Sequence, residues 1–210
     1  MTTPSLVALD MEGVLLEEVW LAIAAHTGIE KLRLTTRDVS DYDELMNMRL
    51  DILNKHGITL ADLQSVIAES VKPLPGAVDF LNWIRRRLPV VILSDIFMEF
   101  VQPVVHLMEY PTILGNSLTV DPDSGMITKY HIRQRDGKRK AVQALRDIGY
   151  TVFAAGDSYN DLTMIKEADA GALFRAPEHI ASAHPEIRTC SEYSELKTLI
   201  QSSLRLPLAA

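Results

Sequence analysis

The sequence contains one cysteine, Cys190, among 210 residues. A single thiol excludes an internal disulfide, so we expect a protein of a reducing compartment. Positive charge is scarce as well, with 21 Lys and Arg against 28 Asp and Glu and a formal net charge of −7. No stretch has the density of Lys and Arg that binding to a phosphate backbone requires, so nucleic acid is not an expected partner.

Long hydrophobic runs are missing too. The apolar run at residues 5–9 is far shorter than the ~20 residues of a membrane-spanning helix, and no basic leader precedes it. The six histidines lack the H-x-x-x-H spacing, which argues against a zinc site. We therefore expect a cytoplasmic protein with no membrane partner. The length suits one domain of ordinary size, or a core with a modest insertion.

Short apolar runs rich in β-branched residues alternate with helical patterns. The runs lie at residues 5–9, 90–93, 151–155 and 170–174, with a weaker one at 187–190. Because these runs are continuous, they predict strands that are covered on both faces, as in a parallel sheet. Helical periodicity at residues 75–88 and 137–149 lies between them. The whole pattern predicts an open α/β fold.

One interval contains no convincing strand. Residues 16–72 carry three helical patterns, at 16–26, 42–56 and 61–71. A helical insertion after the first strand would lie over the carboxyl end of that strand, where open α/β sheets bind ligands. We therefore divide the chain into a core domain, residues 1–15 and 73–210, and a helical cap domain, residues 16–72. A further segment, 116–132, alternates in polarity and predicts a β-hairpin.

Acidic residues follow two of the expected strands. Asp10 and Glu12 come after the first apolar run, and Asp157 and Asp161 follow the run at 151–155. Either pair alone is explained equally well by helix capping, because the helix dipole stabilises acids in the first turn. The exits of parallel strands share one edge of a sheet, however, so neighbouring strands would bring all these carboxylates together. Such a cluster needs a cation, and Mg²⁺ prefers oxygen ligands.

Two further residues indicate an anion site beside these acids. Ser94 ends the apolar run at 90–93, and Lys138 stands at the start of the helical pattern at 137–149. Taken alone, each has a simpler interpretation, as a capping serine and a solvated lysine. Together, a hydroxyl, exposed backbone N–H groups and an ammonium beside Mg²⁺ describe a phosphate site. We therefore expect phosphoryl transfer with a carboxylate nucleophile.

The stretches that carry these residues resemble the four ordered motifs of the haloacid-dehalogenase-like phosphatases. They are LVALDMEGVLL (6–16), VVILSD (90–95), Lys138 within RDGKRKAV (135–142) and AAGDSYNDLTMI (154–165). Within that superfamily the chain most resembles the phosphoserine phosphatase branch, and there the bifunctional enzymes that also transfer the phosphoryl group to homoserine. The resemblance implies a Rossmann-like three-layer α/β core with a parallel sheet and a small helical cap.

The resemblance also implies roles for the acids. Asp10 would be the nucleophile, forming an aspartyl-phosphate, and would also bind Mg²⁺. Glu12, where most members have Asp, would act as general acid and base and bind the metal through its backbone carbonyl. Asp157 would bind Mg²⁺ directly, and Asp161 would either complete the metal shell or brace Lys138. Lys138 would stabilise the phosphoryl group during transfer.

Substrate binding is expected to involve both the core and the cap. Ser94 would hold the transferring oxygens with Lys138, beside Asp95, which stands where many relatives have Gly. In the pattern at 42–56, Arg49 falls within an apolar stripe and therefore needs a partner. That partner is either a nearby acid or, as the resemblance implies, the substrate α-carboxylate, which suits a bidentate guanidinium.

Glu17 and Glu18 are both candidates for binding the substrate α-ammonium group. Periodicity does not choose between them, and the resemblance points to Glu18. The function we expect is Mg²⁺-dependent dephosphorylation of O-phospho-L-serine, with water or homoserine as acceptor. One alternative is another small phosphomonoester, such as phosphoethanolamine or a sugar phosphate. A binding protein on an inactive phosphatase fold is disfavoured, because the motif residues are all present. The oligomeric state stays open, with a homodimer as one option.

Overall fold

The structure is a computed structural model that describes residues 3–35, 38–39 and 41–205. This part of the chain forms a seven-stranded sheet in the order β4-β3-β2-β1-β5-β6-β7. Its strands are β1 (Ser5–Leu9), β2 (Val90–Phe97), β3 (Ile113–Val120), β4 (Ile127–His131), β5 (Thr151–Gly156), β6 (Ala170–Phe174) and β7 (Arg188–Cys190). Neighbouring strands are parallel except β3 and β4, which form the predicted hairpin at one edge.

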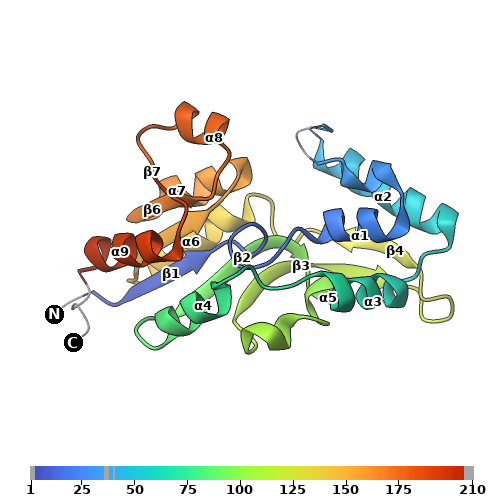
Figure 1. Cartoon of the computed structure of the whole chain (residues 1–210), viewed down its shortest axis with the longest axis horizontal. Coiled ribbons are helices and arrows are strands. Elements are labelled where there is room, and N and C mark those ends of the chain that lie inside the picture. The colour runs from blue at the N-terminus through green and yellow to red at the C-terminus, as the bar shows by residue number, and fades with distance from the viewer. Residues whose placement is uncertain (1–2, 36–37, 40, 206–210) are drawn as a thin grey trace.

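Helices cover both faces of the sheet, because successive side chains of a strand point to opposite faces. Leu6 and Ala8 belong to one buried cluster, with residues of α6 (Gly137–Asp147) and α7 (Leu162–Glu167). Val7 and Leu9 belong to a larger cluster, with residues of α4 (Ala77–Arg85) and α9 (Tyr193–Ser203). The predicted three-layer α/β core is therefore confirmed, as Figure 1 shows. The short elements α5 (Met98–Val101), η2 (Val105–Met108), η3 (Tyr159–Asp161) and α8 (Glu178–Ala183) complete it.

A helical insertion follows β1, as predicted. Its elements are α1 (Val19–Thr27), η1 (Glu30–Arg33), α2 (Tyr42–His56) and α3 (Leu60–Ser70). In this insertion α1 packs on η1 and α3, α3 contacts α5, and α2 lies beside β4. Figure 1 shows α1, α2 and α3 together at the end of the molecule away from α9. The division into two domains at these boundaries stays a prediction. Within the described ranges, no helix has the length and apolar character to cross a membrane.

The insertion is tied together at its base before its first helix begins. The sequence pattern predicts a helix from residue 16, whereas α1 begins at Val19. Leu16 instead forms isolated β-bridges to Glu12 and to Pro73, the first residue after the insertion. The Glu17 side chain also accepts a hydrogen bond from the Lys72 N–H, at 3.1 Å. These contacts join the two ends of the insertion close to the first strand.

Candidate active site

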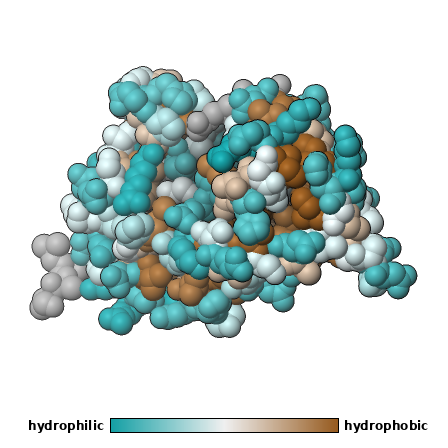
Figure 2. Space-filling model, turned by 45° about the vertical axis from the view of Figure 1, so that its right-hand side comes forward, coloured by the Kyte–Doolittle hydropathy of each residue, from teal (hydrophilic) through white to brown (hydrophobic). Residues whose placement is uncertain are grey.

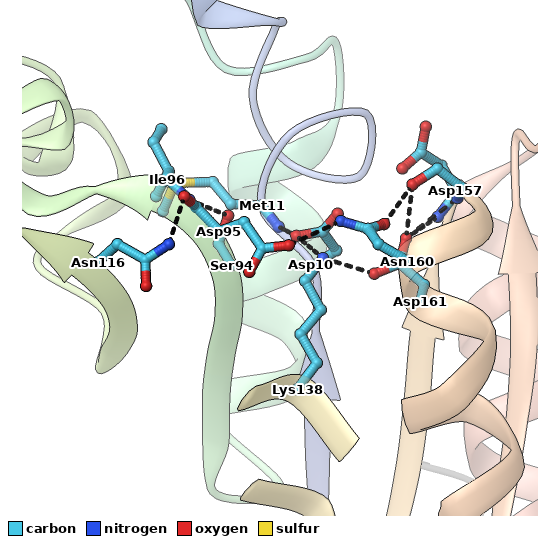
Figure 3. A network of polar contacts seen from close by, with 11 residues as sticks. Asp10, Met11, Ser94, Asp95, Ile96, Asn116, Lys138, Asp157, Asn160 and Asp161 are labelled. Carbon is cyan, nitrogen blue, oxygen red and sulfur yellow. Dashed lines mark hydrogen bonds and ion pairs between the residues drawn. The ribbon is translucent and has the colours of Figure 1, made fainter. Parts of the chain in front are cut away.

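The carboxyl ends of β1 and β5 bring three acids together. The two strands pair in parallel with Leu9 opposite Ala155, and the Asp10 N–H donates to the Ala155 carbonyl at 2.9 Å. Asp10, Asp157 and Asp161 can each offer a carboxylate oxygen to a group whose atoms lie within 4.8 Å of one another. The predicted convergence at one sheet edge is therefore present for three of the four acids, as Figure 3 shows; the Glu12 carboxylate is not part of this group and instead accepts a hydrogen bond from the Val19 N–H.

Two glycines let the acids approach this closely. Gly13 has a φ of +76°, and a Cβ atom there would lie 2.5 Å from the Asp157 Cγ. At Gly156 a Cβ atom would lie 2.2 Å from the Asp161 Cγ. Both distances are far below van der Waals contact, so any larger residue would displace an acid of the cluster.

Lys138, at the start of α6, is the buried cation of the cluster. Its Nζ lies 2.9 Å from the Asp10 Oδ1 and 2.6 Å from the Asp161 Oδ1. Burial alone lowers the pKa of Lys138, but the charges of Asp10 and Asp161 outweigh burial and raise that pKa well above its usual value. The alternative of a solvated lysine is therefore wrong, because this side chain is only 6% exposed.

Asp161 is fully buried, and both of its oxygens have partners. Oδ1 accepts from the Lys138 Nζ, and Oδ2 accepts from the backbone N–H groups of Asp157 and Ser158, each at 3.0 Å. Asp161 therefore orders the loop after β5 and braces the lysine. Of the two roles that the sequence left open, the contacts favour this second one over direct binding of a metal.

The remaining acids carry more negative charge than one lysine balances. Burial, and then the Asp161 charge, raise the pKa of Asp10 well above its usual value despite Lys138. Burial, and then the same Asp161 charge, raise the pKa of Asp157 to about 7. An all-oxygen set with this excess charge is the donor chemistry that Mg²⁺ prefers. Asp10 and Asp157 could hold such an ion.

Ser94 lies near the end of β2 and is buried. Ser94 was open to interpretation as a helix cap from the sequence alone, but β2 continues to Phe97, so no helix begins beside it. Its Oγ accepts a hydrogen bond from the Ile96 N–H at 3.3 Å. The pairing of β2 with β3 shifts register between Leu93 and Phe97, so Ser94 lies at an irregularity of the strand, and it is part of the cavity lining described below.

Two asparagines that sequence reasoning missed hold Asp95 beside Ser94. The Asn160 side chain donates to the Asp95 carboxylate at 3.0 Å, and the Asn116 side chain donates to the Asp95 carbonyl at 2.9 Å. Figure 3 shows Asn160 reaching toward Asp95 from the loop after β5. Asn160 lies inside the fourth motif, one residue before Asp161, and that position was the available signal. Asn116 gave none.

Glu12 joins the strand exits to the cap. Its Oε1 accepts a hydrogen bond from the Val19 N–H, the first residue of α1, at 2.8 Å. Burial, and then the charge of Glu18, raise the pKa of Glu12 to about 7. A raised pKa favours the protonated, neutral form of this carboxyl group.

Arg49 reaches the site from α2. Its side chain is buried, and its Nη2 donates to the Leu34 carbonyl at 2.8 Å. Its guanidinium lies over the Trp20 ring, 4.2 Å from the centroid. Among the described residues it forms no ion pair, and its Nε is buried without a hydrogen-bond partner. The alternative of an internal ion pair is therefore not found in the described part of the chain.

These side chains surround one cavity of about 400 Å³. Its lining includes eight of the predicted site residues: Asp10, Glu12, Glu18, Arg49, Ser94, Asp95, Lys138 and Asp157. Glu18 is part of the lining, whereas Glu17 is used at the base of the insertion. Figure 2 shows the upper part of the molecule hollowed between two raised parts. The cavity is lined from both sides, by Arg49 of α2 and by Tyr159 and Asn160 of η3.

Comparisons with known proteins found a matching family model and curated relatives. Residues 4–169 match the family model described as hydrolase, haloacid dehalogenase-like hydrolase. The chain is 51% identical to the phosphoserine phosphatase ThrH of Pseudomonas aeruginosa (strain PAO1), with 90% of this chain and 91% of that protein covered. It is 50% identical to a phosphoserine phosphatase of Pseudomonas syringae pv. tomato, with 90% of this chain and 79% of that protein covered.

Solved structures share the fold. A phosphoserine phosphatase from T. onnurineus in complex with NDSB-201 is similar with a TM-score of 0.73 and 23% identity, over 95% of both chains. A phospho-aspartyl intermediate analogue of phosphoserine phosphatase is similar with a TM-score of 0.73 and 17% identity, over 96% of this chain and 99% of the other. At these identities the likeness concerns the arrangement of the elements.

Proposed function

The chain belongs to the haloacid dehalogenase-like hydrolases, and from this premise we propose that it is a Mg²⁺-dependent phosphoserine phosphatase. The observation that carries the proposal is one cavity with the Asp10–Lys138 pair at its sheet edge and the guanidinium of Arg49 on its cap side. A phosphate bound beside the pair and a carboxylate bound at Arg49 are the two anionic ends of phosphoserine. The relatives named phosphoserine phosphatase support this substrate.

Asp10 is the proposed nucleophile. Both contacts of its carboxylate within the described residues go to Oδ1, from the Met11 N–H at 2.7 Å and from the Lys138 Nζ. This arrangement restrains the carboxylate and leaves Oδ2 outside these two contacts, so Oδ2 is the proposed attacking atom. The bond from Oδ2 to phosphorus forms as the bond from phosphorus to the serine oxygen breaks, and an aspartyl-phosphate results. A Mg²⁺ held by Asp10, Asp157 and the Glu12 carbonyl would supply positive charge next to the phosphoryl oxygens.

Glu12 is the proposed general acid and base. With a pKa raised to about 7, it is partly protonated at neutral pH, as an acid that later acts as a base requires. Its proton goes to the departing serine oxygen. It then takes a proton from the acceptor as that oxygen attacks the aspartyl-phosphate and frees Asp10. Lys138 and Ser94 hold the oxygens of the phosphoryl group during both steps.

Recognition of the rest of the substrate uses the cavity wall. Arg49 binds the α-carboxylate, and Glu18, at the N-terminus of α1, binds the α-ammonium group. Asp95, held by Asn160, completes the wall beside the phosphate. Homoserine has the same ammonium and carboxylate groups as serine, so the same contacts would place its hydroxyl as an acceptor. We propose both acceptors, and a cytoplasmic location in keeping with the single thiol.

Product analysis tests this function. The protein is incubated with phosphoserine and Mg²⁺, with and without homoserine, and free phosphate and phosphohomoserine are quantified. We expect phosphate in both reactions, phosphohomoserine in the second, and neither product with EDTA or with Asp10→Asn. Phosphoethanolamine, which lacks the carboxylate, should be a poor substrate. Equal turnover of phosphoethanolamine would overturn the substrate assignment, and turnover by Asp10→Asn would overturn the covalent mechanism.

A further inference from the structure

Arg49 has an unusual environment for a buried cation. Its side chain is only 6% exposed, and a buried guanidinium normally has a carboxylate partner. In the described part of the chain its only oxygen partner is the Leu34 carbonyl, and its Nε donates to nothing. Burial lowers the pKa of Arg49 to about 10, so it stays charged at neutral pH.

Trp20 provides the other support for this guanidinium. Its ring centroid lies 4.2 Å from the Arg49 Cζ, inside the range in which a cation is attracted to an aromatic face. Trp20 is held in turn by Phe100, whose ring packs edge-on at 5.5 Å, and Phe100 packs edge-on against Phe97 of β2. The three rings therefore connect the Arg49 guanidinium to β2 of the core and restrain its position.

An aromatic ring and a carboxylate would both stabilise the Arg49 guanidinium, but they differ in whether its N–H groups remain available to a substrate. A carboxylate of the chain would occupy the planar fork of the guanidinium and leave nothing to bind a substrate. The Trp20 ring contacts only the face of the guanidinium plane. At its edge, one N–H of Nη2 donates to the Leu34 carbonyl and one of Nη1 points to the Met46 Sδ at 3.7 Å, so the Nε–H and the second N–H of each terminal nitrogen stay available. The cavity therefore contains an ordered guanidinium, and the carboxylate of an incoming substrate would supply its missing ion-pair partner.

From this geometry we propose that Trp20 is a positioning residue for substrate specificity: it holds the Arg49 guanidinium where the substrate carboxylate binds. The inference rests on the proposed function, since it concerns the carboxylate end of the same substrate. It assigns Trp20 no contact with the reacting atoms. Its loss acts on recognition of the carboxylate and leaves the phosphoryl chemistry at Asp10 unchanged.

A comparison of two substrates tests this role. In Trp20→Leu we expect the KM for phosphoserine to rise about tenfold, with kcat within about twofold of the wild type, since cation–π contacts in partly desolvated sites have this strength. The slow turnover of phosphoethanolamine should not change, because it has no carboxylate for Arg49. Trp20→Phe, which keeps an aromatic face, should restore much of the lost affinity.

Trp83 supplies the matched control. It is the other tryptophan of the chain, and the Arg87 Cζ lies 4.8 Å from its ring, but it is not part of the cavity lining. Trp83→Leu therefore removes the same type of contact outside the cavity lining and should leave both KM values unchanged. In an Arg49→Ala background, Trp20→Leu should cause no further loss with phosphoserine, because the two residues act as one unit.

Fluorescence gives a second measurement that does not depend on turnover. In Asp10→Asn with Trp83→Phe, Trp20 is the sole tryptophan, so its emission should change and saturate with phosphoserine but not with phosphoethanolamine. A wild type without phosphoserine turnover would contradict the proposed function itself. If the wild type is active, two results would contradict the role of Trp20. In one, Trp20→Leu lowers kcat/KM for both substrates equally; in the other, it lowers kcat/KM for neither.

Discussion

At the scale of single residues, the arrangement of the site depends on the position of one lysine, Lys138, among several carboxylates. The Lys138 Nζ contacts the proposed nucleophile Asp10 and the buried Asp161 at once. Asp161 is held by two backbone N–H groups as well, so Lys138 is fixed from the side away from the cavity. This fixed ammonium orients Asp10 and leaves one of its oxygens for chemistry, while the excess negative charge creates a place for a divalent cation.

Gly13 offers a direct test of how closely the acids are packed. In Gly13→Ala the new Cβ would lie 2.5 Å from the Asp157 Cγ, at a φ of +76°. We expect Asp157 to move, the Mg²⁺ concentration for half-maximal activity to rise about tenfold or more, and the melting temperature to fall. Titration of phosphatase activity with Mg²⁺ measures the first effect.

Gly28→Ala is the control for this substitution. Gly28 has a φ of +69°, close to that of Gly13, but a Cβ atom there would meet nothing within 4 Å. It should therefore show only the cost of a left-handed backbone, roughly 1 kcal/mol, and keep the Mg²⁺ dependence of the wild type. If the two variants had the same Mg²⁺ dependence, close packing against Asp157 would not matter for the metal.

The length of the Glu12 side chain could affect the choice between water and homoserine as phosphoryl acceptor. Its side chain spans from the strand exit to the Val19 N–H at the start of α1, a distance that the shorter Asp would not cover. In Glu12→Asp we expect the ratio of phosphohomoserine to free phosphate to fall, because a carboxyl group withdrawn from α1 leaves room for a water molecule. Quantifying both products at fixed homoserine gives the ratio, and an unchanged ratio would exclude this effect of the extra methylene.

At the scale of elements, the sequence predicted the features that follow from local pattern. Asp10 and Asp157 could be placed together because they follow buried strands, and the exits of parallel strands share an edge. The contacts of Trp20, Asn160 and Asp43 could not be predicted from the sequence. Each of these residues contacts one that is distant in the chain, and no local pattern reveals such a contact. Asp43, for example, accepts a hydrogen bond from Tyr130, 87 residues away. The extension of β2 past residue 93 depends on its pairing with β3, which no local pattern predicts either.

The contact of Asp43 ties the α2 helix to the core. Its carboxylate accepts from the Tyr130 hydroxyl at 2.6 Å and from the Arg135 guanidinium at 2.8 Å. Because α2 carries Arg49, Asp43→Ala should let that helix move and raise the KM for phosphoserine severalfold. Steady-state kinetics measures the effect. Asp51 is exposed on the same helix and forms no ion pair within the described residues, so Asp51→Ala should leave the KM unchanged, and a rise in both variants would refute the specific role of Asp43.

The same contact should depend on pH. Hydrogen bonds from Tyr130, and then from Arg135, lower the pKa of Asp43 below its usual value. A carboxyl group whose pKa is lowered by folding stabilises the fold above its unfolded pKa, and that contribution is lost as pH falls through the folded pKa. The contacts of Asp43 with Tyr130 and Arg135 should therefore persist throughout the neutral range and weaken only below about pH 4.

At the scale of the whole molecule, we expect the acid cluster to couple folding to Mg²⁺ and to pH. The folded pKa of Asp157 is raised to about 7 by burial and the Asp161 charge, and that of Asp10 is raised for similar reasons. The metal-free folded state therefore binds more protons than the unfolded state between about pH 4 and pH 7. Its stability falls as pH rises through that window, and the loss is complete above the folded pKa.

Mg²⁺ should reverse this loss, because it binds the deprotonated carboxylates. We expect the rise in melting temperature on adding Mg²⁺ to be large at pH 8 and small at pH 5.5, where protons compete for the same oxygens. Thermal melts with Mg²⁺ or EDTA at the two pH values measure it. In Asp157→Asn, which removes one of the raised pKa values and one ligand, the metal-free protein should gain stability at pH 8 and respond less to Mg²⁺. An equal Mg²⁺ effect at both pH values would show that the ion binds elsewhere than at these acids.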